Sequence, residues 1–391
     1  MPRSWDVVVV GLGAMGSAAL YQLSKRHGRV LGIDSFEPPH ERGSSHGETR
    51  ITRRAIGEGM QFVPLALRSG EIWQSLERET GRSLYVPNGL LVFGREGKSR
   101  SDHGVADFLT STRRAAAEFR IPHEILDHPE LRRRFPQFGY VGDEVGYYEP
   151  GAGFLRPEAC IDTQLACARR NGAELRLGKP VTGLEPAAGG DGVILHCNGQ
   201  TVRASRVILT VGAWISRFLS PQQSRNLRVC RQTLHWFPID ADPAAYAPEC
   251  CPVFIRLSDE ENDMIYGFPA LDGARGGMKV ACEQLEVTCE PEEMERTVSA
   301  SESAAVWRTV SQFLPLAMPP LKARACLYTL TPDFGFLIDR HPQYPQVILA
   351  SACSGHGFKH SAAIGEILAE LALENRSTLD ISGFSFTRFS G

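Results

Sequence analysis

The sequence lacks a hydrophobic run long enough to cross a membrane, and it lacks an excess of positive charge. Its longest apolar stretches, such as DVVVVGLG at residues 6–13, have the length of a strand, whereas a membrane helix needs about 20 apolar residues. Lys and Arg number 42 and Asp and Glu 45, which gives a net charge of −3. Because the apolar runs are too short for a membrane helix, and because no basic surplus can neutralise phosphates, we expect neither a membrane nor nucleic acid as the main partner.

Cysteine is present, but in no metal-binding or redox pattern. The ten cysteines form no C-x-x-C pair, and only Cys250 and Cys251 are adjacent, a spacing that suits neither a zinc site nor an ordinary disulfide. We therefore expect no metal, and mostly reduced core thiols as in a cytosolic protein. The ends of the chain carry no recognisable signal peptide or sorting tag, which also predicts a cytoplasmic location.

The chain opens with a strand–helix–strand pattern. Its 391 residues are 42% hydrophobic, enough for a large core and two domains. Residues 6–10 read as a buried strand, residues 17–28 as a helix and residues 29–34 as a second strand. Between the first two, Gly11, Gly13 and Gly16 fit the dinucleotide fingerprint, in which glycines allow a tight turn and close approach to a pyrophosphate. Asp34 ends the second strand, where an acid can hold ribose hydroxyls.

The remainder of the chain favours FAD over NAD. After Asp34 the sequence becomes rich in Gly, Ser, His and Arg, and further nucleotide-type segments return only near residues 210 and 355. Such discontinuity favours an extended FAD. The segment 86–149 is helix-rich and charged, and 216–318 carries alternating strands. We expect a discontinuous FAD-binding domain (1–85, 150–215 and 319–391) and a sheet-based substrate domain (86–149 and 216–318).

Lys359 occupies an unusual place. Residues 348–372 open as a buried strand and close as an amphipathic helix, and Lys359 stands at the start of that helix. A cation there is unfavourable by about a few tenths of a kcal/mol, because the first backbone N–H groups already carry partial positive charge. The position suits an anion bound between the lysine and the helix, such as a substrate carboxylate.

Four motifs in order along the chain resemble one family. They are GSSHGETRITRRA, YGFPA, ACLYTLTPDFGFLIDRHP and SGHGFKHSAAIGE. Together they are similar to monomeric sarcosine oxidase, N-methyltryptophan oxidase and pipecolate oxidase, FAD-dependent amine oxidases, over essentially the whole chain. The resemblance implies an α/β glutathione-reductase-like FAD-binding domain with a second antiparallel-sheet (α+β) substrate domain. It also implies a monomer.

The resemblance also implies roles for individual residues. Cys326 matches the cysteine that tethers the flavin covalently, 33 residues before Lys359. Such a tether would keep the flavin bound and raise its potential. His46 and Arg50 match residues packed against the flavin ring, although a structural role in a Gly/Ser loop is the alternative for His46. Lys279 matches the oxygen-activating lysine, whose charge would stabilise the negative charge that develops on O₂.

On the substrate side, Arg53 and Lys359 match two residues that bind the amino-acid carboxylate. Arginine can bind it with two parallel hydrogen bonds, and lysine adds a point charge. Tyr266 and Tyr328 would line the pocket. Glu283 stands where sarcosine oxidase has a histidine. Cys353 also departs from the family pattern, which argues against sarcosine itself as the substrate.

The fingerprint and the resemblance together predict a set of cofactor contacts. It comprises Gly11, Gly13, Ala14, Met15, Gly16, Asp34, Ser44, Val181, Gly212, Cys326, Gly355, His356, Gly357, Phe358 and Lys359.

The expected activity is oxidation of secondary, N-methyl or cyclic amino acids. A hydride equivalent would pass to covalent FAD and on to O₂, giving hydrogen peroxide, and the imine product would be hydrolysed. Two alternatives stay open. One is a flavin dehydrogenase that passes electrons to an acceptor other than oxygen, and the other is a non-catalytic nucleotide-binding protein.

Overall fold

The apolar run at the start of the chain forms the central strand of a parallel sheet. The structure, a computed structural model, describes residues 4–26, 28–95, 104–187, 189–190, 192–258 and 264–389. Strand β1 (Trp5–Val10) lies between two parallel neighbours, β2 (Val30–Ile33) and β12 (Gln200–Leu209). Val8 is aligned with Leu31 on one side and Val207 on the other. Because such strands are covered on both faces, they read as continuous apolar runs. The predicted strand–helix–strand unit is confirmed, with α1 (Ala14–Ser24) as its helix.

The first large sheet places three distant segments side by side. β12 is also parallel to β19 (Tyr344–Ser351), so β1, β12 and β19 are adjacent. The chain segments near residues 10, 210 and 355, which were expected to face a nucleotide, therefore leave the same edge of the sheet. The other strands of this sheet are β9 (Glu174–Arg176), β10 (Val181–Pro186), β11 (Val193–Cys197) and β18 (Leu337–His341).

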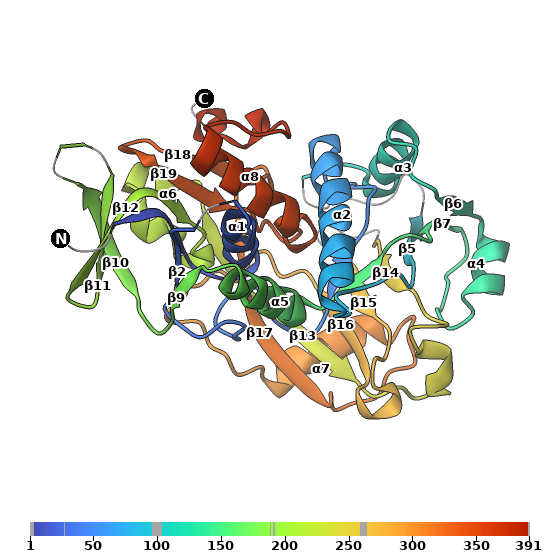
Figure 1. Ribbon diagram of the computed structural model, residues 1–391. Helices are drawn as coiled ribbons and strands as arrows, with labels where there is room; N and C mark the ends of the chain where they lie inside the picture. Colours follow the sequence, from blue (N-terminus) through green and yellow to red (C-terminus); the bar gives the residue numbers. More distant parts are fainter. Residues whose placement is uncertain are drawn as a thin grey trace.

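Helices stack beside this sheet. α1 packs between α5 (Pro157–Arg170) and α8 (Ser361–Glu374), and α2 (Val63–Thr80) packs against α8, as Figure 1 shows. α8 is buried along almost its whole length. Within the described part of the chain, none of the helices is long and apolar enough to cross a membrane.

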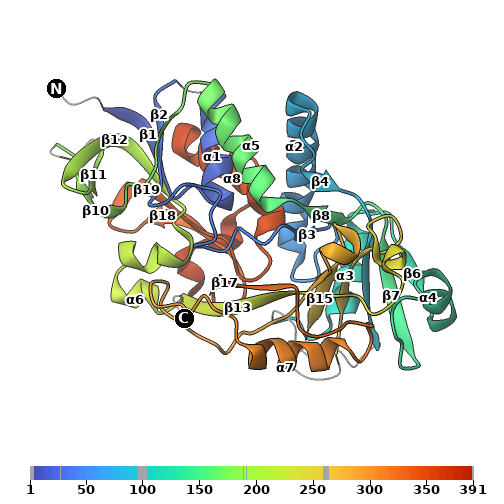
Figure 2. The same cartoon turned by 90° about the horizontal axis from the view of Figure 1, so that it is seen from below.

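A second large sheet forms the opposite half of the molecule (Figure 2). Its order is β17 (Lys322–Leu330), β13 (Arg228–Phe237), β16 (Met278–Cys282), β15 (Ile265–Phe268), β14 (Val253–Arg256), β5 (Leu90–Arg95), β7 (Glu144–Glu149) and β6 (Glu124–Leu126). All neighbours are antiparallel except β14 and β5. The predicted fold class, an α/β part with a second, mainly antiparallel sheet, is confirmed.

The expected division of the chain into domain segments stays a prediction. One strand bears on it directly: β17 pairs with β13 along its length, so residues 322–330 belong to the second sheet although 319–391 was expected in the FAD-binding part. Residues 86–149 supply α3 (Phe108–Glu118) and α4 (His128–Arg134), as expected from their composition, and also β5, β6 and β7.

The remaining elements connect the two halves. A three-stranded sheet of β3 (Arg50–Thr52), β8 (Gly153–Leu155) and β4 (Tyr85–Val86) lies near their junction (Figure 2). The short α6 (Pro221–Ser224) and the longer α7 (Ala300–Val310) complete the α-helices of the described residues.

Candidate active site

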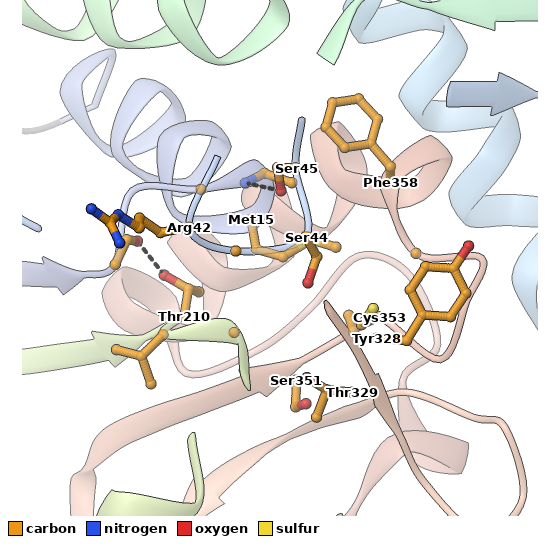
Figure 3. Close-up of a pocket in the computed structure, with 18 of the residues that line it drawn as sticks. Met15, Arg42, Ser44, Ser45, Thr210, Tyr328, Thr329, Ser351, Cys353 and Phe358 are labelled. Carbon is orange, nitrogen blue, oxygen red and sulfur yellow. Dashed lines mark hydrogen bonds between the residues drawn. The ribbon is translucent and has the colours of Figure 1, made fainter. Parts of the chain in front are cut away.

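An elongated cavity of about 570 Å³ is lined by residues from both large sheets. One end lies at the carboxyl ends of β1, β2 and β12, and the other is bordered by Tyr266 of β15 and Tyr328 of β17. Figure 3 shows part of its wall, with Met15, Ser44 and Thr210 on one side and Tyr328 and Cys353 on the other. Large concave pockets at such strand ends are the usual place for a nucleotide cofactor.

The fingerprint glycines form the first end of the cavity. Gly11, Gly13, Ala14 and Met15 line it, where α1 begins. A Cβ atom on Gly16 would lie 1.7 Å from the Gly11 carbonyl oxygen, so only glycine permits this approach of helix and strand. The N-terminus of α1 thus directs its partial positive charge at the cavity, an arrangement that suits a pyrophosphate.

Asp34 borders the same end. One carboxylate oxygen accepts a hydrogen bond from the Leu12 N–H at 2.6 Å and the other from the Phe36 N–H at 2.8 Å. The buried carboxylate therefore holds the fingerprint turn and the loop after β2 in fixed positions beside the cavity.

The segment 44–50 brings three predicted residues together. The guanidinium of Arg50 donates to the carbonyl oxygens of Thr49 at 2.8 Å and Ser44 at 2.7 Å, and Arg50 lines the cavity. His46 is buried just behind it, and neither ring nitrogen has a hydrogen-bond partner within the described residues. Burial, reinforced by the charges of Arg50 and Lys279, lowers the pKa of His46 to about 3, so its ring is neutral.

Lys279 of β16 reaches the same segment from the second sheet. Its ammonium donates to the Gly47 carbonyl at 2.7 Å, the Thr49 carbonyl at 2.9 Å and the Thr49 hydroxyl at 3.0 Å. It also lies 4.5 Å from the centre of the Phe268 ring. Burial lowers the pKa of Lys279 well below its usual value, and the nearby Arg50 lowers it further. Lys279 lies behind the wall of the large cavity and lines a small neighbouring one of about 10 Å³.

Two cysteines lie near the middle of the cavity. Cys326 is on the same face of β17 as Tyr328 and packs in one apolar cluster with it, but it is fully buried and does not line the cavity. Cys353 packs against this cluster and does line the cavity (Figure 3). Burial raises the pKa of the Cys326 thiol, while the charges of Arg50 and Lys279 oppose that rise.

The far end of the cavity contains two buried cations and an acid between them. Arg53 donates to Glu58 Oε2 at 2.5 Å, and Lys359 Nζ lies 3.8 Å from Glu58 Oε1. Lys359 also donates to the His356 carbonyl at 2.6 Å. Burial lowers the pKa of Lys359 to about 8, an effect that Glu58 opposes and Arg53 reinforces. The position of Lys359 predicted an anion beside it, and within the chain Glu58 is that anion.

Three further predicted residues surround this end. The hydroxyls of Tyr266 and Tyr328 are 3.1 Å apart and hydrogen-bonded, and both rings line the cavity. Burial is the main reason why the pKa of each tyrosine is raised. Glu283 also lines the cavity, and its charge acts on Lys359 and on both tyrosines.

Most predicted site residues line this one cavity. On the substrate side these are Arg53, Tyr266, Glu283, Tyr328 and Lys359, and among the predicted cofactor contacts Gly11, Gly13, Ala14, Met15, Asp34, Ser44, Val181, Gly212, Gly355, His356, Gly357, Phe358 and Lys359. Gly16, His46, Lys279 and Cys326 lie behind its wall. The roles of all these residues stay predictions.

Sequence reasoning missed Glu58 and the lining residues Ser45 and Thr210. Ser45 Oγ accepts from the Ala14 N–H at 3.3 Å, and Thr210 Oγ1 donates to the Gly11 carbonyl at 2.7 Å, so both hold the fingerprint turn. Glu58 had one sequence signal, an acid between Gly57 and Gly59 five residues after Arg53.

Known proteins match nearly the whole chain. Residues 6–371 fit the family described as FAD dependent oxidoreductase. The chain is 40% identical to the monomeric sarcosine oxidase of Streptomyces avermitilis, over 100% of this chain and 99% of that protein. It is 33% identical to the N-methyl-L-tryptophan oxidase of Yersinia pestis, over 98% and 99%. Among solved structures, NikD, described as an unusual amino acid oxidase essential for nikkomycin biosynthesis, aligns with a TM-score of 0.81 at 25% identity, covering 98% of this chain and 97% of that one. The chain therefore belongs to the family of FAD-dependent oxidoreductases.

Proposed function

We propose that this protein is an FAD-dependent oxidase of secondary amino acids, N-methyl or cyclic, that passes electrons to O₂. One observation carries the proposal: the cavity that starts at the dinucleotide fingerprint ends at two buried cations, Arg53 and Lys359, which suit a substrate carboxylate. The names of the matched relatives, sarcosine oxidase and N-methyl-L-tryptophan oxidase, support an N-methyl amino acid as the substrate class.

The residues present fit FAD. The N-terminus of α1 and the glycines beside it suit the pyrophosphate, and Asp34 lies where a ribose would be held. The unsatisfied ring nitrogens of buried His46, next to Arg50 at the cavity wall, suit a polar ring system. When bound, FAD supplies the acceptor for the hydride equivalent that leaves the carbon beside the substrate nitrogen.

The chain's own residues would bind and orient the substrate. Arg53 offers a bidentate fork and Lys359 a point charge to the carboxylate, which then replaces Glu58 as their common anion. The Tyr266–Tyr328 pair borders the amine and the substrate side chain. The amine must be neutral to release a hydride equivalent, and the positive charges of Arg50 and Lys279 favour its deprotonation.

Lys279 would serve the oxygen reaction. A buried cation stabilises the negative charge that develops on O₂ as it is reduced, and hydrogen peroxide is then released. The imine product is hydrolysed in water.

The alternative is a dehydrogenase with a different electron acceptor. Lys279→Met separates the two functions, because it should slow reoxidation by O₂ about 100-fold or more while anaerobic reduction by substrate continues. Equal loss of both half-reactions would remove the oxygen-activating role.

We propose Cys326 as the covalent attachment point of the flavin. Its support is the match of its motif to the family and its position on the cavity-facing side of β17 beside Tyr328. We further propose that the protein is a cytoplasmic monomer. None of the ten cysteines forms a disulfide with another, which suits a reducing compartment.

A further inference from the structure

Two consecutive residues beside Lys279 have a left-handed backbone. Gly47 has a φ of 98° and Glu48 a φ of 69°. A Cβ atom on Gly47 would lie 2.8 Å from a methyl group of Leu234, so glycine suits this position for two reasons. Glu48 has no such freedom, and a left-handed residue other than glycine costs about 1–2 kcal/mol. Other contacts must therefore hold this turn in its conformation.

The turn directs its acceptors onto one ammonium group. The carbonyls of Gly47 and Thr49 and the hydroxyl of Thr49 all accept from Lys279 Nζ, at 2.7, 2.9 and 3.0 Å. These three acceptors satisfy all three donors of a protonated lysine. The position of the Lys279 charge thus depends on the conformation of residues 47–49.

Glu158, at the start of α5, binds the backbone of residues 47 and 48. Its Oε1 accepts from the Gly47 N–H at 2.6 Å and from the Glu48 N–H at 3.0 Å. The Glu48 side chain is also held in place. Its carboxylate accepts a hydrogen bond from Trp236 Nε1 at 2.9 Å and forms an ion pair with Lys322. Glu158 binds the N–H groups of both left-handed residues, and within the turn the Thr49 N–H donates to the Gly47 carbonyl at 2.8 Å.

We propose that Glu158 is a positioning residue for Lys279, which keeps the Lys279 charge in place for the reaction with oxygen. The inference rests on the proposed function, because it requires Lys279 to act on O₂. Glu158 acts in two ways. It orients the carbonyls that accept from Lys279, and its negative charge favours the protonated lysine.

Other charges face Lys279 as well. Arg50 disfavours the protonated lysine, while Glu48 favours it, and Lys322 lies on the Trp236 ring that Lys279 also contacts. The contribution of Glu158 therefore has to be separated from theirs by substitution.

Two variants separate the two effects. Glu158→Gln keeps a side-chain oxygen that can accept from both amides but removes the charge, whereas Glu158→Ala removes both. Glu77→Ala is the matched control, since Glu77 Oε1 also accepts two successive N–H groups, those of Leu84 at 2.8 Å and Tyr85 at 3.0 Å. Lys279→Met provides the reference for full loss of the lysine.

The measurements are anaerobic flavin reduction by substrate and reoxidation by O₂, each followed by stopped flow across pH. Glu158→Ala should slow reoxidation about 3- to 30-fold, an intermediate part of the loss in Lys279→Met, with reduction changed less than about 3-fold. Glu158→Gln should keep most of the rate at low pH. Because it loses a charge that favours protonated Lys279, its rate should fall at a pH about 0.5–1 unit lower than in wild type. Crystal structures should show the Gly47 and Thr49 carbonyls turned from Lys279 in Glu158→Ala only.

The outcomes distinguish the inference from the proposed function. Normal reoxidation in Lys279→Met contradicts the oxygen role of the lysine itself. Slow reoxidation in Lys279→Met, with wild-type rates and pH profiles in both Glu158 variants, overturns the inference alone. Equal effects of Glu77→Ala and Glu158→Ala would show general destabilisation and also overturn it. If Glu158→Ala does not fold with FAD bound, the pH profile of Glu158→Gln decides.

Discussion

Glu58 accepts a hydrogen bond from Arg53 at 2.5 Å, and both side chains are almost completely buried. The same carboxylate lies 3.8 Å from Lys359 Nζ, so one internal anion serves two cations at the end of the cavity. A substrate carboxylate that binds to both cations must compete with Glu58 for them. Affinity at this site is therefore the difference between two carboxylate interactions. In the ligand-free protein Glu58 offsets part of the charge of the two buried cations.

Glu58→Gln should destabilise the ligand-free protein and strengthen carboxylate binding. Loss of one partner of a buried ion pair costs about 3–5 kcal/mol, which should lower the melting temperature by roughly 5 °C. The dissociation constant for acetate should fall about tenfold, because the internal competitor is gone. Acetate should accordingly raise the melting temperature more in the variant than in wild type. Glu71→Gln, which breaks the exposed pair with Arg68, should change neither quantity. Weaker acetate binding in Glu58→Gln would contradict the competition.

Carboxylate binding should weaken as the pH rises above about 8. Burial lowers the pKa of Lys359 to about 8, so the ammonium is present below this pH and is lost above it. Titration of acetate against the flavin absorbance should give a dissociation constant that rises about tenfold per pH unit on the alkaline side. Lys359→Arg should abolish this alkaline rise of the dissociation constant, because arginine stays protonated. If the dissociation constant of Lys359→Arg still rises with pH, another group is responsible for the titration.

Arg53→Ala and Lys359→Ala should each weaken binding of amino-acid substrates and simple carboxylates. Removing one partner of a charge-assisted pair in a partly desolvated site costs about 2–5 kcal/mol. The double variant should lose less than the sum if both residues hold one carboxylate. An amine substrate without a carboxylate serves as the control and should respond to neither change. Unaltered carboxylate affinity in Lys359→Ala would exclude the lysine from the site.

The flavin should remain attached to the protein after acid precipitation, and Cys326→Ala should release it into the supernatant. Cys353→Ala is the matched control, since Cys353 lines the cavity and packs against the same cluster as Cys326. It should leave the attachment intact. Release of flavin from Cys353→Ala but not from Cys326→Ala would show that Cys353, and not Cys326, is the attachment point. Release from wild type would exclude a covalent bond altogether.

The sequence was sufficient where function depends on local pattern. The glycine fingerprint predicted β1, α1 and β2, and the odd position of Lys359 indicated an anion beside it. It was not sufficient to identify that anion. Glu58 is five residues from Arg53, but it contacts Lys359 only because the short helix Phe358–His360, which precedes α8, lies beside it. The two residues are 301 positions apart in the chain. A tertiary contact of this kind leaves no periodic signal.

Glu158 shows the same limit. An acid in the first turn of a helix is common, because it interacts favourably with the helix dipole, so its sequence context gives no reason to single it out. Its partner amides lie 111 and 110 residues earlier in the chain. The left-handed backbone at Glu48 is likewise invisible, since glutamate does not favour that conformation.

Oxidation of a secondary amino acid with O₂ as the acceptor can be tested in one cuvette. N-methyl and cyclic amino acids are added to the purified protein without oxygen while the flavin band at about 450 nm is followed, and air is then admitted. The band should disappear with a substrate and return within seconds in air, and its return should be accompanied by hydrogen peroxide equal in amount to the flavin reoxidised. A band that disappears but returns only with an added quinone would contradict the oxidase function, and a band that no amino acid bleaches would contradict the substrate class.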